Sequence, residues 1–140
     1  MTWLTDRIRW IMVIAGVLTA TMVSAAIDPQ AALQSMFGET LTGPVAELVV
    51  RNWGALIALV GGMLIWGAFH PPSRPLALVV ASVSKLGFIG LVLATGLVGR
   101  TGRVRVSIVV DAIVVLVFAI NLAREFRSSR LGHPGQGASP

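Results

Sequence analysis

The sequence lacks cysteine and is poor in charge, and each deficit excludes whole classes of protein. None of the 140 residues is Cys, so disulfides, thiolate metal sites and cysteine nucleophiles are ruled out. Charged residues make up only 12% of the chain, against about a quarter in ordinary soluble domains. A soluble domain of this size covers its surface with charge, and this chain has too little charge to do so.

Residues that carry chemistry are also scarce. The two histidines are His70, in a proline-rich turn, and His133, in a Gly-, Pro- and Ser-rich tail. Neither is placed for a bis-histidine haem site inside a bundle. The sequence contains no HExxH, no P-loop and no dinucleotide fingerprint. We therefore expect a non-enzymatic protein without a metal or cofactor.

Apolar residues are what the chain has in abundance. They form 55% of it, and the mean hydropathy is +0.83. A membrane-spanning helix needs about 20 mostly apolar residues, and four stretches reach that length, at about 8–27, 45–69, 76–98 and 104–123. The sequence predicts an all-α integral membrane four-helix bundle.

Local signals explain the breaks between these stretches. Asp28 followed by Pro29 is typical of a helix N-cap with proline in the first turn, and Gly38 suits a left-handed C-cap. These signals predict a short extra helix over 29–37 in the first loop. The remaining breaks fall at Gly43-Pro44, at the proline-rich segment 70–75 and at Thr101-Gly102. We expect one domain over 1–126 and a disordered cytoplasmic tail over 127–140.

The first apolar stretch has a second interpretation. Basic residues precede it and Val23-Ser24-Ala25 ends it, as in a signal peptide with a small-residue cleavage site. The stretch is long for a signal peptide, which favours a retained helix.

The basic residues indicate an orientation, because cytoplasmic loops are enriched in Lys and Arg. Basic residues at the ends of apolar stretches also account for the net charge of +5 without a nucleic-acid partner. With the N-terminus inside, six arginines lie on the inner side: Arg7, Arg9, Arg74, Arg124, Arg127 and Arg130. Three lie outside: Arg100, Arg103 and Arg105. The count predicts a bacterial-type inner membrane protein with both termini in the cytoplasm; a cytoplasmic Arg100–Arg105 cluster would reverse this.

Ionisable residues inside the apolar stretches are candidate functional residues, because hydrocarbon disfavours charge. Arg51 follows Pro44 by seven residues, and Asp111 follows Val104 by seven. Similar depth makes an Arg51–Asp111 ion pair reasonable, with Glu47 one turn from Arg51. Asn52 can add hydrogen bonds. Such a network either locks two helices together or forms a polar pocket or ion path.

Lys85 lies near the middle of the third stretch. It is about nine residues from the inner end and fourteen from the outer end, too deep for easy snorkelling. Asp111 is the nearest carboxylate in expected depth, about 10 Å away along the membrane normal. A structural and a functional role for Lys85 stay open.

Small residues recur at helical spacing on two stretches. They are Gly54, Ala58 and Gly62 on the second, and Gly87, Gly90 and Ala94 on the third. Such stripes let helix backbones approach closely, within one bundle or between protomers. We expect contacts within the bundle.

The layout from Glu47 to Ala123 resembles small four-helix membrane proteins of the DoxX-like kind. The resemblance depends on Arg51 leading into Gly54, Gly61 and Gly62, on a glycine-bearing third helix and on the single buried acid Asp111. It implies an accessory role in membrane-bound oxidoreductase or redox-stress complexes. The longer first loop and the Arg100–Arg105 cluster depart from that family's pattern, and no functional residue is carried over.

Two functions follow as hypotheses. The first is an accessory or scaffold subunit, or a homo-oligomer, with a larger membrane protein or a second copy as partner. The alternative is a small transporter or channel in which the buried Arg, Lys and Asp residues handle a proton or an anionic solute.

Overall fold

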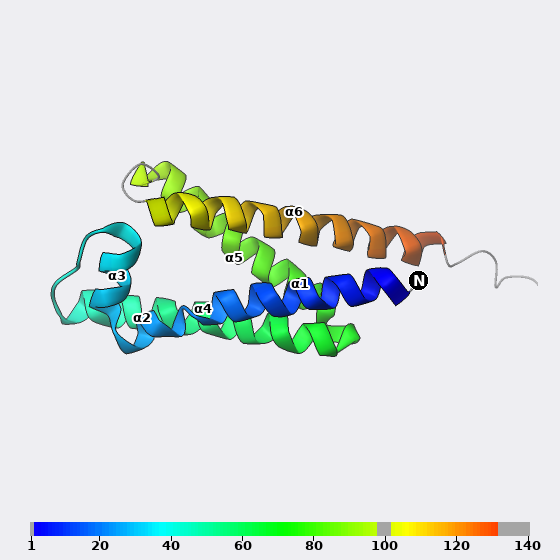
Figure 1. The fold of residues 1–140 in the computed structure, drawn as a ribbon, viewed down its shortest axis with the longest axis horizontal. Coiled ribbons are helices and arrows are strands. Elements are labelled where there is room, and N and C mark those ends of the chain that lie inside the picture. Colours follow the sequence, from blue (N-terminus) through cyan, green and yellow to red (C-terminus); the bar gives the residue numbers. More distant parts are fainter. Residues whose placement is uncertain (1, 98–101, 132–140) are drawn as a thin grey trace, which may run out of the picture.

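The structure, a computed structural model, describes residues 2–97 and 102–131 of the chain. Those residues are all-helical and contain no strand. The elements in order are α1 (Thr2–Ala20), α2 (Val23–Ile27), α3 (Pro29–Phe37), α4 (Pro44–Phe69), η1 (Pro71–Ser73), α5 (Arg74–Ala94) and α6 (Gly102–Leu131). The N-terminus and the C-terminal end of α6 lie at the same end of the molecule, and α3 lies at the other (Figure 1).

Four segments are long and apolar enough to span a membrane, which confirms the predicted number of apolar helices. They are Asp6–Ile27, Pro44–Phe69, Pro71–Ala94 and Gly102–Arg124. Two predicted bounds are wrong. Helix α5 ends at Ala94 instead of reaching 98, and α6 continues to Leu131, so residues 127–131 are helical. The rest of the predicted tail, 132–140, lies outside the described residues.

The short helix α3 forms where its capping signals predict it. The Asp28 carboxylate accepts a hydrogen bond from the backbone N–H of Ala31 at 3.0 Å, and Pro29 occupies the first turn. Gly38 ends the helix in the left-handed region at φ 73°, which favours glycine because it has no Cβ. Leu33 is buried against Ala25 and Val50, so α3 covers α2 and the N-terminal part of α4.

The first apolar stretch is interrupted, which the sequence does not predict. Thr21 and Met22 form a turn between α1 and α2, and the Thr21 hydroxyl donates to the Leu18 carbonyl at 2.6 Å. After the turn, the chain runs against α4. A Cβ built on Gly54 would lie 2.7 Å from the Ala26 nitrogen, so only glycine fits there.

Helices α1 and α4 form the closest packing contact. A Cβ at Gly61 would lie 2.6 Å from both the Ala20 nitrogen and the Gly16 carbonyl oxygen, and a Cβ at Gly16 would lie 2.8 Å from the Gly61 oxygen. The two backbones therefore meet at a pair of glycines, as small-residue contacts allow.

Buried apolar side chains form two clusters, one near each end. The larger cluster joins α1, α4, α5 and α6, with Met12, Leu64, Leu78 and Phe118 fully buried. The smaller cluster joins α2, α3 and α4 around Ala25, Leu33 and Val50. The middle of the molecule lies between them.

Helix α6 is the least enclosed of the four long helices. In the most apolar window of its candidate span, 6% of residues are buried, against 22% for each of the others. It packs mainly on α5 and also touches α3. Its exposed residues include Val106, Val109, Ile113, Leu116 and Ile120. Most of the α6 surface is thus apolar and uncovered by this chain.

Candidate functional site

An ion pair between Lys85 on α5 and Asp111 on α6 is the main polar feature in the middle of the molecule. The Lys85 ammonium donates to the Asp111 Oδ1. The side chains are 12% and 18% exposed, so both charges are largely enclosed by protein. Removing charges from water is costly, and pairing them is how proteins usually compensate that cost.

The helix ends explain why these two residues meet. Helix α5 ends at Ala94, nine residues after Lys85, and α6 begins at Gly102, nine residues before Asp111. Because consecutive helices run in opposite directions, equal distances from the connection put the two residues at one level. The predicted offset of about 10 Å was wrong because the third helix was expected to run to 98 and the fourth to begin at 104, whereas they end at Ala94 and begin at Gly102.

Both residues also lie on the buried faces of their helices. On α6, Val104, Asp111 and Phe118 are spaced by seven residues, and the two apolar ones are fully buried. On α5, Lys85 follows the buried Leu78 by seven residues and precedes the buried Val92 by seven. A seven-residue repeat keeps side chains on one helix face. The ion pair therefore occupies a position that an apolar pair would otherwise fill.

Arg51 does not pair with Asp111, which corrects the network expected from depth. Its Nη1 donates to the backbone carbonyls of Ala26 and Ile27 at 2.7 and 2.9 Å. These are orphan carbonyls at the end of α2, which a cation satisfies well. Helix α4 packs on α1, α2 and α5, whereas α6 packs on α5 and α3. Helices α4 and α6 are therefore not main packing neighbours, and the expected pair does not form.

The other members of the expected network are also separate. No ion pair joins Glu47 to Arg51 among the described residues, although the two are one turn apart. Glu47 is half-buried in the first turn of α4 and Asn52 is exposed. The structure thus brings together Lys85 and Asp111 out of the predicted set, and leaves Glu47, Arg51 and Asn52 elsewhere.

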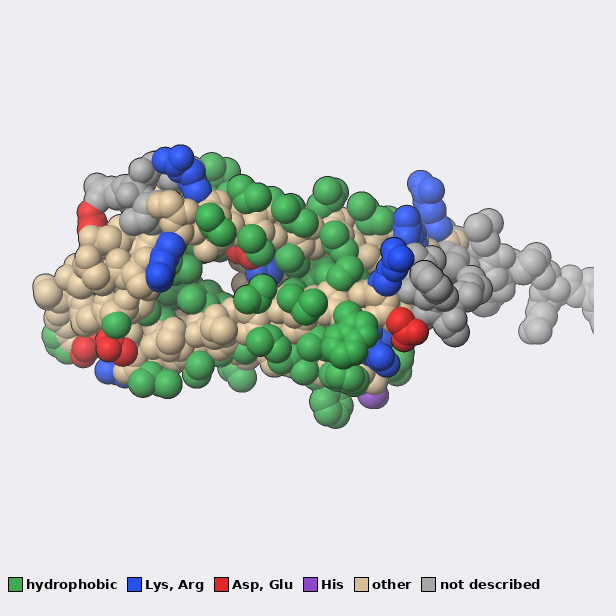
Figure 2. All heavy atoms as spheres, viewed as in Figure 1, with side chains coloured by type: hydrophobic (Ala, Val, Ile, Leu, Met, Phe, Trp, Pro, Cys, Tyr) green, Lys and Arg blue, Asp and Glu red, His purple; other side chains and the backbone are tan. Residues whose placement is uncertain are grey.

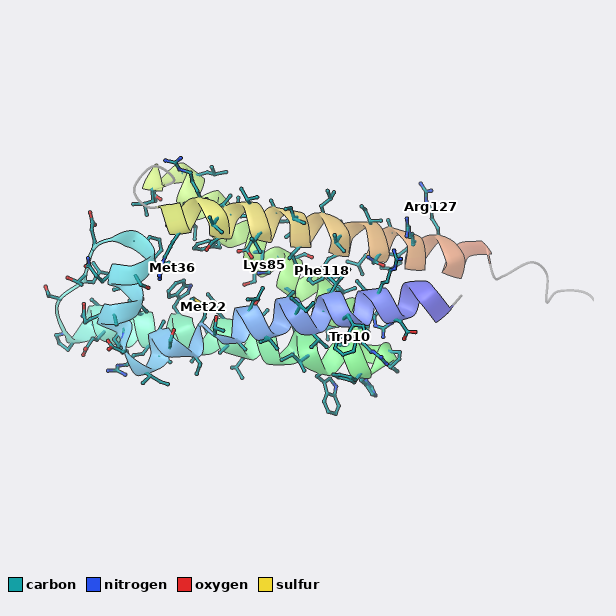
Figure 3. All side chains as sticks on the ribbon, viewed as in Figure 1. Trp10, Met22, Met36, Lys85, Phe118 and Arg127 are labelled. Carbon is teal, nitrogen blue, oxygen red and sulfur yellow. The ribbon has the colours of Figure 1, made fainter. Side chains whose placement is uncertain are left out.

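An opening passes through the molecule beside the ion pair. Figure 2 shows it between α6 and α1, with an acidic and a basic side chain at its margin. Lys85 lies at this level, between the two helices in the view of Figure 3. One turn before Lys85, the Ser82 hydroxyl is buried without a hydrogen-bond partner. Polar atoms of Lys85, Asp111 and Ser82 therefore lie close to this level.

An apolar cavity lies between α3, α4 and α5, on the side of the ion pair toward α3. Its volume is about 370 Å³. Phe37, Trp53, Phe88 and Val92 are among its lining residues. Phe88 follows Lys85 by three residues, so the two share a face of α5. The cavity offers room for apolar groups and almost no hydrogen-bonding partners.

The small-residue stripes are only partly inside the bundle. Gly54 packs tightly against α2, as expected. A Cβ at Gly62, Gly87 or Gly90 would meet no atom within 4 Å, Ala94 is exposed and Ala58 is half-buried. The expectation of contacts within the bundle is therefore wrong for Gly62, Gly87 and Gly90. Gly16 and Gly61 make the closest contact instead.

The histidine that the structure describes has local partners. The His70 Nδ1 lies 2.8 Å from the Ser73 hydroxyl, and the ring stacks on Trp66 with centroids 5.6 Å apart. Within residues 2–97 and 102–131, no group of three His, Asp or Glu residues is arranged to hold a metal ion. His133 lies outside that part of the chain.

These features define an all-helical protein with four candidate membrane-spanning helices. Comparison with protein-family models, with curated proteins and with solved structures finds no match. The DoxX-like resemblance therefore stays a hypothesis, and the functional argument depends on the site alone.

Proposed function

We propose that this protein is a non-enzymatic subunit of a bacterial-type inner membrane, acting as an accessory or scaffold protein or as a homo-oligomer. The observation that supports this most is that three charges within the candidate spans have partners within the fold. Lys85 and Asp111 neutralise each other between α5 and α6, and Arg51 caps the end of α2. Charges engaged in this way stabilise one packing arrangement.

The uncovered surfaces agree with a role in assembly. Helix α6 exposes most of its apolar surface, and open glycines lie on α4 and α5 at Gly62, Gly87 and Gly90. Lipid covers apolar surfaces of a membrane protein, but small residues on an outward face allow another helix to approach closely. We place the contact with a partner on these faces.

The proposed orientation has both termini in the cytoplasm. We call the end of the molecule that carries the N-terminus the basic end. Its arginines are Arg7, Arg9, Arg74, Arg124 and Arg127. The opposite end carries three acidic residues and three arginines, which are Asp28, Glu39, Glu47, Arg51, Arg103 and Arg105. Positive charge is enriched on the cytoplasmic side.

Native mass spectrometry of the protein, gently extracted from its own membrane, tests the proposal. The proposal predicts a stoichiometric complex with a larger membrane protein or with further copies of this chain. A monomer that retains a small solute would contradict it.

A small transporter or channel is the second candidate function. The opening beside Lys85 and Asp111, with the unpartnered Ser82 hydroxyl at the same level, supports it. Proteoliposomes loaded with a pH-sensitive dye separate the two candidates. Proton or anion flux that disappears in Asp111→Asn would favour transport, and flux equal to that of protein-free vesicles would favour assembly.

A further inference from the structure

A second cavity lies at the basic end, away from the Lys85–Asp111 pair. Its volume is about 260 Å³, far more than the roughly 30 Å³ that one water molecule takes up in the liquid. The lining residues come from the start of α1 and from the α4–η1–α5 connection: Asp6, Arg9, Ala68, Phe69, Pro71 and Arg74. Two of the three charged residues are arginines.

Arg74 is buried in the wall of this cavity, and no counter-ion for it is found among the described residues. It is 7% exposed. One Nη2 hydrogen bond reaches the Ala68 carbonyl at 3.2 Å, and the buried Nε has no partner. A guanidinium has five N–H donors, and none of those of Arg74 reaches a carboxylate in the part of the chain that the structure describes. A buried charge is normally paired, so this site lacks an anion.

The other charged groups at the cavity leave it positive. Arg9 and Asp6 form a loose pair at 3.8 Å, with side chains 40% and 64% exposed. Counting Arg74, the lining carries two positive charges and one negative. Basic side chains gather around this end in the space-filling view (Figure 2).

The cavity also lies where headgroups of the proposed membrane would be. It is formed at the junction of the candidate spans Pro44–Phe69 and Pro71–Ala94. Two tryptophans lie close in sequence to lining residues: Trp10 follows Arg9, and Trp66 precedes Phe69 by three residues. Their side chains are 58% and 64% exposed, and tryptophan rings prefer the interface between hydrocarbon and water.

We propose that this cavity binds a phosphate group, with Arg74 as the buried anchor and Arg9 as the exposed second cation. Arginine suits this role because its planar fork donates two hydrogen bonds to one oxyanion. The phosphate has two sources, the headgroup of an anionic phospholipid or free inorganic phosphate. Asp6 opposes the anion, so its removal strengthens binding.

The test uses full-length protein in detergent, with phosphatidylglycerol, phosphatidylcholine and inorganic phosphate as separate probes. Native mass spectrometry counts retained lipid, and a thermal melt follows phosphate. We expect wild type to retain phosphatidylglycerol at least about ten-fold more than Arg74→Gln does, a difference of about 1.4 kcal/mol. Phosphatidylcholine retention stays low in both. Arg124→Gln, an exposed arginine at the same end, is the matched control and behaves as wild type.

Two further variants keep the test decisive if Arg74→Gln fails to fold. Arg9→Gln should weaken phosphatidylglycerol retention, and Asp6→Asn should increase it. If only inorganic phosphate raises the melting temperature, and only with Arg9 and Arg74 intact, free phosphate is the ligand. Equal retention of both lipids, together with no phosphate effect in wild type, would overturn the proposal. A loss in Arg124→Gln as large as that in Arg9→Gln would overturn it as well.

Discussion

Lys85 and Asp111 lie nine residues from the facing ends of α5 and α6, and this equal spacing puts their charges in contact. Helix α6 is the least enclosed of the long helices. The ion pair therefore stabilises the packing of α6 against the rest of the bundle. It also fixes the rotation of α6, because a turn about its axis would separate the charges.

Replacing one member of the pair should destabilise the protein more than replacing both. Lys85→Met or Asp111→Leu leaves an unpaired enclosed charge, which we expect to lower the free energy of unfolding by about 3 kcal/mol. The double variant should recover most of that loss, because two apolar side chains pack where the charges were. Reversible unfolding of the wild type, the two single variants and the double variant in mixed micelles measures this double-mutant cycle. Additive losses would contradict an interaction between these two residues.

Arg51 should contribute independently of Asp111. Arg51→Gln removes two charge-assisted hydrogen bonds to the Ala26 and Ile27 carbonyls, at a cost of about 1 kcal/mol. Since these groups are on α2 and Asp111 is on α6, the losses of Arg51→Gln and Asp111→Leu should add. A coupling energy above about 0.5 kcal/mol between the two substitutions would show that Arg51 and Asp111 interact, and would contradict this prediction.

Of two adjacent glycines on α4, only Gly61 should be sensitive to replacement by alanine. Gly61→Ala places a methyl group 2.6 Å from the Ala20 nitrogen and the Gly16 oxygen, so the α1–α4 contact must open. We expect a loss of about 2 kcal/mol, in the range of overpacked cores. Gly62→Ala meets no atom and is the matched control. Thermal melts that rank the two variants the other way would show that α1 and α4 meet on a different face.

The orientation can be tested with single cysteines, because the chain contains none. Thr42 and Pro72 are exposed and lie before and after α4, at opposite ends of that helix. In intact cells, a membrane-impermeant maleimide should label Thr42→Cys and leave Pro72→Cys unlabelled until the membrane is permeabilised. The reverse pattern would place the basic end outside.

Local signals predict the parts of this fold that are determined by a few neighbouring residues. Asp28, Pro29 and Gly38 specify α3 because capping and the left-handed turn involve only nearby backbone. The end of α5 is also specified locally, but a prediction based on hydropathy misses it. Gly96 has φ 70°, and Thr95 donates its hydroxyl to the Leu91 carbonyl at 2.8 Å. The apolar run continues past the point where the helix stops.

The candidate site was harder to predict because it depends on which helices are neighbours. Depth estimated from the sequence pairs Asp111 with Arg51, and the packing order of the helices excludes that pair. Rotation is a second unknown, since Gly61 and Gly62 differ by about 100° around the helix. The seven-residue spacing of Val104, Asp111 and Phe118 was a usable signal, because it marks Asp111 as part of the buried face of α6.

The measurement that tests this account most directly is native mass spectrometry of wild type and of Lys85→Met/Asp111→Leu, each extracted from the native membrane. If the pair serves packing and the outward faces serve assembly, both proteins should appear in the same stoichiometric complex. A wild-type monomer holding a small solute that the double variant has lost would show that Lys85 and Asp111 form a binding site, and would contradict the account.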